Sequence, residues 1–198
     1  MEIERYVLGP LATNTYLIKE GNDVLLIDPA SKAEKLIGII GEDRLAGILL
    51  THGHFDHIKA VDGLYEHYHC PIYLHEDDEE LARDKHAGDD FGISSYIVSP
   101  IMKLKEGKMN IGPFTFEVVF TPGHTEGSVI YIFGHMIFSG DTLFRCGVGR
   151  TDLRGGDMRK LKDSLRYFSS LDEEYDIYPG HDEATCLSFE LLNNPYMY

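Results

Sequence analysis

The sequence predicts an α/β (α+β) protein in which two β-sheets pack face to face and helices lie outermost. Strand patterns dominate both halves of the chain, and helical patterns interrupt these strands without alternating strictly with them. The 198 residues are enough for one well-filled hydrophobic core. We therefore expect one domain over residues 1–198.

The first half of the chain begins with strand patterns. Residues 2–8 alternate polar and apolar side chains, and Gly9-Pro10 and Gly21-Asn22 provide turns. The short apolar run at 45–50 is typical of a fully buried strand. The strands expected in this half are 2–8, 13–20, 23–28, 45–50 and 71–75.

Helices are expected between these strands. Ser31-Lys-Ala-Glu34 resembles a capping box, which predicts a helix over residues 32–40. A second helix is expected over 57–69. The acidic run 76–80 is expected to open a third helix and to face water, since acidic groups favour helix N-termini.

The second half repeats the strand-rich pattern. Residues 86–100 lack periodicity and are expected to form a loop, which can be one wall of a substrate pocket. Helices are expected over 157–170 and from about residue 185. The expected strands are 101–105, 108–111, 114–121, 128–133, 136–140 and 175–178.

Composition narrows the function classes. A net charge of −15 disfavours binding to nucleic acid phosphates. No apolar run approaches the ~20 residues that span a bilayer, and the first ten residues lack a signal-peptide pattern, so we expect a cytoplasmic protein without a membrane partner. Cys70, Cys146 and Cys186 are far apart, which disfavours a disulfide framework.

A dense group of metal-ligand residue types follows the buried strand at 45–50. The segment Thr51-His-Gly-His-Phe-Asp-His57 contains His52, His54, Asp56 and His57. Imidazole nitrogen and carboxylate oxygen suit zinc, iron and manganese. Gly53 lets the backbone turn tightly, so these side chains can converge on one point.

Three later strands end in the same way. His124 follows Pro122-Gly123, Asp141 follows Gly140, and His181 follows Pro179-Gly180. Seven ligands exceed the roughly four that one tetrahedral ion takes. They suit two ions ~3.5–4 Å apart that share a carboxylate and a water.

The segments THGHFDH, TPGHTEGS, SGDTLF and YPGH resemble the metallo-β-lactamase superfamily, and are most similar to its glyoxalase II (hydroxyacylglutathione hydrolase) branch. The resemblance implies a four-layer αββα sandwich of two mixed sheets with the site at one edge. It implies that one ion is held by His52, His54 and His124. It implies a second ion at Asp56, His57 and His181, with Asp141 bridging the two.

The same resemblance implies a chemistry. Glyoxalase II enzymes cleave S-D-lactoylglutathione, and the expected reaction is thioester hydrolysis by a hydroxide that bridges two divalent ions, with zinc the first expectation and iron or manganese the alternatives. Asp56 and Asp141 would position this hydroxide. The expected partner is a small-molecule thioester or ester; the oligomeric state is not predicted.

The chain also departs from glyoxalase II. The helical C-terminal extension of those enzymes has no counterpart in these 198 residues. The glutathione-contacting Lys and Tyr of those enzymes align with Arg150 and Asp152. Arg150 can still bind a carboxylate, whereas the Tyr contact is lost.

Other functions within the superfamily stay open. Persulfide dioxygenases use a single iron held by the equivalents of His52 or His54, His124 and Asp141. A hydrolase of another ester or of a lactone is the remaining alternative.

Overall fold

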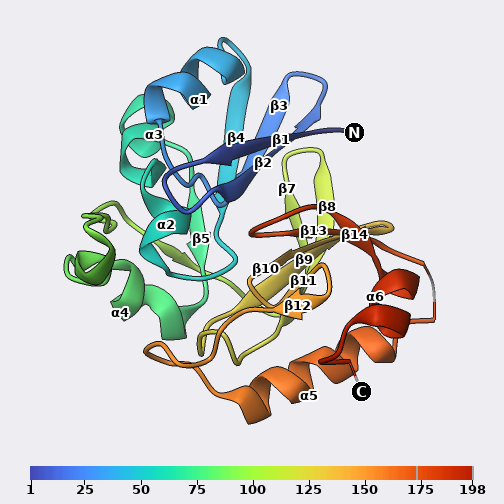
Figure 1. Cartoon of the computed structure of the whole chain (residues 1–198). Coiled ribbons are helices and arrows are strands. Elements are labelled where there is room, and N and C mark those ends of the chain that lie inside the picture. Colours follow the sequence, from blue (N-terminus) through green and yellow to red (C-terminus); the bar gives the residue numbers. More distant parts are fainter. Residues whose placement is uncertain (173, 198) are drawn as a thin grey trace.

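The computed structural model describes residues 1–172 and 174–197 and contains two six-stranded sheets packed face to face (Figure 1). The strand order of the first sheet is β1-β2-β3-β4-β5-β6. Its strands are β1 (Glu2–Leu8), β2 (Thr13–Glu20), β3 (Asp23–Ile27), β4 (Arg44–Leu49), β5 (Ile72–Leu74) and β6 (Met102–Lys103). The first three strands pair antiparallel and β3 to β6 pair parallel, so the sheet is mixed.

The second sheet has the order β14-β13-β10-β9-β8-β7. Its strands are β7 (Gly107–Ile111), β8 (Phe114–Phe120), β9 (Val129–Phe133), β10 (Met136–Gly140), β13 (Asp176–Pro179) and β14 (Thr185–Cys186). This sheet is also mixed, because β10 and β13 pair parallel and the other neighbours antiparallel. A separate hairpin joins β11 (Leu143–Phe144) to β12 (Gly147–Val148).

Helices cover the outer faces of the sheets. They are α1 (Ala33–Ile40), α2 (Phe55–Ile58), α3 (Val61–Tyr68), α4 (Glu79–Ala82), α5 (Met158–Ser169) and α6 (Leu187–Asn193), with 3₁₀ turns η1 (Glu76–Asp78) and η2 (Asp89–Phe91). Helix α5 buries Leu161, Leu165 and Phe168 at helical spacing, and Asp157 caps its first turn. None of the helices in the described part of the chain is long and apolar enough to cross a membrane.

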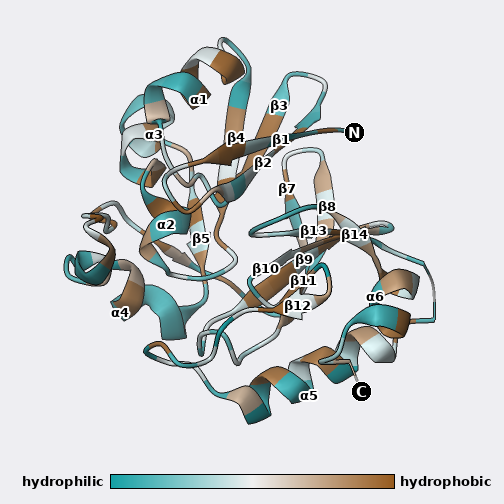
Figure 2. Cartoon of the chain, viewed as in Figure 1, coloured by the Kyte–Doolittle hydropathy of each residue, from teal (hydrophilic) through white to brown (hydrophobic). Residues whose placement is uncertain are grey.

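Three apolar layers hold this arrangement together. Tyr16 and Ile27 of the first sheet share a cluster with Phe116 and Tyr131 of the second, so this core lies between the sheets. The other two clusters pack α1 and α3 on the first sheet and α5 on the second. Figure 2 shows much of the hydrophobic colour on the strands, whereas outer helices such as α5 carry hydrophobic and hydrophilic bands in alternation. The expected fold of two mixed sheets with outer helices is confirmed.

Several expected elements have different bounds. The capping box does not form: Lys32, in the left-handed region at φ 59°, occupies the N-cap of α1 without a side-chain cap. The helix expected over 57–69 is interrupted between α2 and α3, because the Ala60 amide donates to the Pro29 carbonyl instead of within a helix. The strand expected over 101–105 is only two residues long.

Two further features were missed or wrongly interpreted. The sequence did not indicate the β11–β12 hairpin or the short strand β14. In the acidic run, Asp78 is buried and does not face water. The three cysteines are free, as expected.

Candidate metal centre

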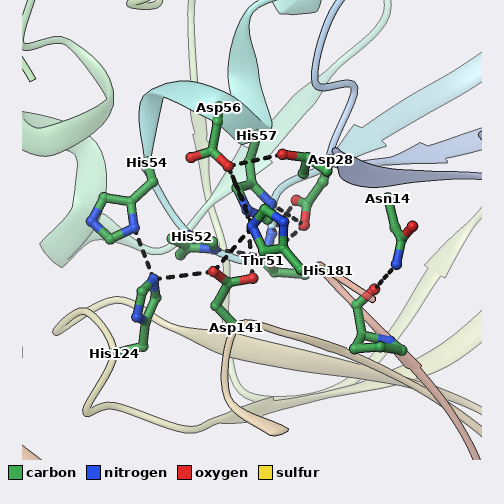
Figure 3. A network of polar contacts seen from close by, with 12 residues as sticks. Asn14, Asp28, Thr51, His52, His54, Asp56, His57, His124, Asp141 and His181 are labelled. Carbon is green, nitrogen blue, oxygen red and sulfur yellow. Dashed lines mark hydrogen bonds and ion pairs between the residues drawn. The ribbon is translucent and has the colours of Figure 1, made fainter. Parts of the chain in front are cut away.

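The seven predicted ligands lie together at one edge of the sandwich (Figure 3). His52 and His54 lie in the loop after β4, and Asp56 and His57 belong to α2. The other three follow strands of the second sheet: His124 after β8, Asp141 after β10 and His181 after β13. The site therefore draws ligand types from both sheets.

Among the described residues, two groups contain only predicted ligands, and a third group, formed by Asp28, His52 and His57, overlaps both of them. Ligand atoms of His52, His54 and His124 all lie within 4.8 Å of one another. The same limit holds for Asp56, His57 and His181. This division matches the one implied by the resemblance.

Asp141 lies between the two groups. Its Oδ2 is 3.5 Å from Nε2 of His124 and 3.5 Å from Nε2 of His181. Its Oδ1 is 3.5 Å from Nε2 of His57. A carboxylate in this position can contact an ion in either group.

Several buried polar atoms of the centre have no hydrogen-bond partner among the described residues. They are Nε2 of His52, Nε2 of His57 and Oδ1 of Asp141. Unpartnered buried polar atoms are costly and need an explanation. Nitrogen and oxygen donors that converge in this way fit divalent metal ions.

Electrostatics differ between the two groups. Burial, followed by neighbouring imidazoles, lowers the pKa of His52 and brings the pKa of His54 to about 3, so both rings keep a free lone pair. Burial opposes the charged form of His57, yet the carboxylates of Asp56, Asp141 and Asp28 raise its pKa to about 10. The second group thus holds a proton that a metal ion must displace.

Partners outside the two groups orient the imidazoles. Nδ1 of His57 is 2.9 Å from Oδ2 of Asp28, and Nδ1 of His124 is 2.7 Å from the carbonyl oxygen of Arg150. In each case Nδ1–H donates outward, so Nε2 is the nitrogen that faces the centre. Nδ1 of His181 is likewise 3.1 Å from the Leu11 carbonyl oxygen.

Asp28 is a residue that the sequence interpretation missed. It is buried, and its carboxylate also accepts hydrogen bonds from the Thr51 amide at 2.8 Å and the Thr51 hydroxyl at 2.6 Å. It therefore joins the end of β3 to the start of the ligand loop. Asp28 directly follows β3, as Asp141 directly follows β10, but the expected strand 23–28 included it, so it was not recognised.

Asp78 was missed for a different reason. Its carboxylate accepts hydrogen bonds from the amides of Gly53 and Gly127, both at 2.8 Å, and from the Thr125 hydroxyl at 2.7 Å. These bonds connect the loop that carries His54 with the loop that carries His124. No sequence pattern distinguished Asp78 from its acidic neighbours.

Glycines make the close packing of the centre feasible. A Cβ on Gly180 would lie 2.2 Å from Oδ1 of Asp141, and one on Gly149 would lie 1.9 Å from the Asp141 carbonyl oxygen. Any side chain at these positions would displace Asp141. The expectation that glycine before His181 allows a close approach is consistent with this geometry.

A cavity of about 400 Å³ opens over the centre. Five of the candidate ligands and Arg150 line it, together with an apolar wall. That wall consists of Leu11, Phe55, Phe91, Phe144, Val148 and Leu153. Phe91 comes from the segment 86–100, so this segment forms part of the wall, and the volume suits a small-molecule ligand.

The chain is similar to known proteins along nearly its whole length. A family model described as the metallo-β-lactamase superfamily matches residues 8–181. The probable metallo-hydrolase YqgX of Bacillus subtilis (strain 168) is 36% identical over 206 residues, covering 100% of this chain and 98% of YqgX.

Two solved structures are similar along nearly the full chain. The B3 metallo-β-lactamase BLEG-1 has a TM-score of 0.91 and 36% identity, covering 99% of each chain. TTHA1623, in a di-iron-bound form, has a TM-score of 0.90 and 39% identity, covering 98% of this chain and 99% of that one.

Proposed function

Because the chain belongs to the metallo-β-lactamase superfamily, we propose that it is a binuclear metal-dependent hydrolase of thioesters, similar to glyoxalase II. The observation that carries this proposal is the convergence of seven histidine and aspartate side chains beneath an apolar cavity. The motifs shared with glyoxalase II support the thioester, with S-D-lactoylglutathione as the reference substrate.

We propose that His52, His54 and His124 hold one ion, that Asp56, His57 and His181 hold the other, and that Asp141 contacts both. When bound, divalent ions supply Lewis acidity that activates water and polarises a carbonyl. Zinc is the first expectation, and the di-iron form of TTHA1623 supports iron as an alternative.

The protein's own groups set up the reaction, in which one water and one thioester yield a carboxylic acid and a thiol. The Thr13 hydroxyl donates to Oδ2 of Asp56 at 2.8 Å, which fixes this carboxylate so that it can orient the attacking water. The apolar wall holds the acyl group and excludes other water. A thiolate leaves readily, so the site needs no strong general acid.

The test combines metal analysis with an assay on the same sample. Protein purified without chelator is expected to contain about two ions per chain. It should hydrolyse S-D-lactoylglutathione or a simpler thioester, lose activity with chelator and regain it with metal. The Asp141→Asn variant should lose most of this activity. Two ions without turnover of any thioester would contradict the proposal.

A second candidate is a mononuclear iron persulfide dioxygenase. Nδ1 of His54 lies 2.8 Å from Nε2 of His124, which lies 3.5 Å from Asp141, so two histidines and one carboxylate are close together. Such a triad suits iron that activates oxygen. One iron per chain and oxygen uptake with glutathione persulfide would favour this function over hydrolysis.

A further inference from the structure

The inference concerns Arg150, the cationic side chain that lines the cavity next to Val148 and Leu153. The same cavity is lined by His54, His124 and Asp141, so the guanidinium faces the space above the centre. A guanidinium in this place would ordinarily recruit a substrate carboxylate.

The Arg150 guanidinium already forms an ion pair with the carboxylate of Asp152. Nε of Arg150 donates to Oδ1 of Asp152 at 2.7 Å, and an Nη donates to Oδ2 at 2.8 Å. This bidentate arrangement is the one that a substrate carboxylate would adopt. Asp152 therefore occupies the Nε–Nη edge of the guanidinium and neutralises its charge.

The segment that carries both residues is held in place on either side. Before it, the Arg150 carbonyl accepts from His124; after it, the Asp157 amide donates to the Gly123 carbonyl at 2.8 Å. Arg154 pairs with Glu80 at 2.5 Å and with Asp84 at 3.3 Å. The positive charge of Arg154 is thus also neutralised by carboxylates of this chain.

We propose that Asp152 is a specificity-determining residue that competes for Arg150 and makes the site select thioesters whose thiol portion carries no carboxylate. To reach Arg150, an anionic substrate must displace the Asp152 carboxylate. It then lies close to that unpaired carboxylate, which repels it. A neutral substrate can pack against the Arg150–Asp152 pair and the adjacent apolar side chains without this cost. The inference rests on the proposed thioester hydrolysis and narrows its substrate class: S-D-lactoylglutathione, whose glutathione portion carries carboxylates, should be a poorer substrate than a neutral thioester.

The test uses two thioesters that differ only in a carboxylate: S-butanoyl-N-acetylcysteamine, which is neutral, and S-butanoyl-N-acetylcysteine, which is anionic. The measured quantity is the ratio of kcat/KM for the anionic over the neutral substrate. The Asp152→Asn variant should raise this ratio about threefold to fivefold, the range that an exposed ion pair can account for.

Asp163→Asn is the matched control. The Asp163 side chain is 69% exposed, as is that of Asp152, and it also pairs with an arginine, Arg166, but on α5. The ratio should be unchanged in this variant, which excludes a general effect of net charge. The double variant Asp152→Asn/Arg150→Gln should lose the gain, because the freed guanidinium is then absent.

A binding measurement separates this inference from the proposed function. Calorimetry on the metal-loaded protein would compare the Kd values of the S-butyl thioethers of the same two thiols, which cannot be hydrolysed. A relative gain in the affinity of the anionic thioether for Asp152→Asn supports the inference even if no thioester is turned over. An unchanged or decreased ratio would overturn it, since Asp152 would then only hold Arg150 in position.

Discussion

A buried carboxylate outside the predicted ligand set, that of Asp28, orients an imidazole of the centre. Asp28 accepts from both the backbone and the hydroxyl of Thr51 and contacts His57. Its backbone has φ 49°, a left-handed conformation that Asp and Asn tolerate better than most residues. Asp28 thus adopts a strained backbone conformation at the end of β3, and its side chain fixes the position of His57, one of the candidate ligands.

The Asp28→Asn variant should weaken metal binding without preventing folding. Asparagine keeps the size and the tolerated backbone, but its neutral amide cannot accept all three hydrogen bonds of the carboxylate. We expect metal affinity at the His57 group to fall about 10- to 100-fold, the usual cost of losing such a partner. Competition with a chromophoric chelator measures this. If the Asp28→Asn variant bound metal as tightly as the control variant Asp43→Asn, Asp28 would have no role in orienting His57.

The pH dependence of metal binding should differ between the two groups, because ligands must be deprotonated to bind. His52 and His54 have lowered pKa values, so their group stays ready for metal well below neutral pH. The pKa of His57 is raised to about 10 and that of His181 is also raised, so protons compete at their group. Affinity there rises with pH.

Metal content should therefore fall stepwise on acidification. Between about pH 8 and about pH 6 at fixed free metal, we expect the protein to go from two ions towards one. Elemental analysis after equilibrium dialysis measures this, and the ion retained should be the one at the three-histidine group. Loss of both ions over the same pH interval would contradict the assignment of separate groups.

Among the elements, local sequence patterns predicted the longer strands, but they did not predict several of the connections between elements. The alternation at Glu2–Leu8 and the apolar run that became β4 reflect burial of strand faces, which the sequence records directly. The break between α2 and α3 depends on the distant Pro29 carbonyl. The β11–β12 hairpin has two-residue strands, too short for any periodicity.

The same reasoning applies to the candidate site. The density of His and Asp in residues 52–57 marked four of the clustered residues, and a strand-end glycine before His or Asp marked the other three, because a close backbone approach constrains the sequence locally. Asp78 and the apolar wall depend on which loops meet in space. Such long-range packing leaves no local pattern.

The missed hairpin is held by α6 in a way that can be tested. Glu190 is fully buried and accepts hydrogen bonds from the Cys146 amide at 2.8 Å, the Thr185 hydroxyl at 2.5 Å and the Asn194 amide group at 2.8 Å. The hairpin in turn places Phe144 and Val148 in the cavity wall. Helix α6 thus supports the wall of the cavity from outside.

The Glu190→Ala variant should lower the free energy of unfolding by about 3 kcal/mol, because three donors lose their acceptor. For a chain of this size that corresponds to a Tm lower by roughly 6–12 °C. Thermal denaturation followed by circular dichroism measures it. Glu183→Ala, at a side chain 75% exposed, is the control and should change stability by less than about 0.5 kcal/mol. Equal Tm values for the two variants would show that α6 does not anchor the hairpin.

At the scale of the whole molecule, the centre connects the two sheets. The loop after β4 and the short helix α2 bring four candidate ligands from the first sheet, and β8, β10 and β13 bring three from the second. The shared apolar core already joins the sheets. Metal ions would add a second connection at the edge, where buried imidazoles and carboxylates otherwise face one another.

Metal removal should therefore destabilise the whole fold and not only abolish activity. An ion at 100 times its Kd stabilises the folded state by about 2.7 kcal/mol, and each kcal/mol moves Tm by about 2–4 °C at this size. For two ions we expect dialysis against chelator to lower Tm by roughly 10–20 °C, and added zinc, iron or manganese to restore it. The His181→Ala variant should show a smaller metal-dependent shift, whereas His67→Ala, outside the centre, should show the full one. A Tm that does not respond to metal in the wild-type protein would mean that the seven side chains do not bind ions across the two sheets.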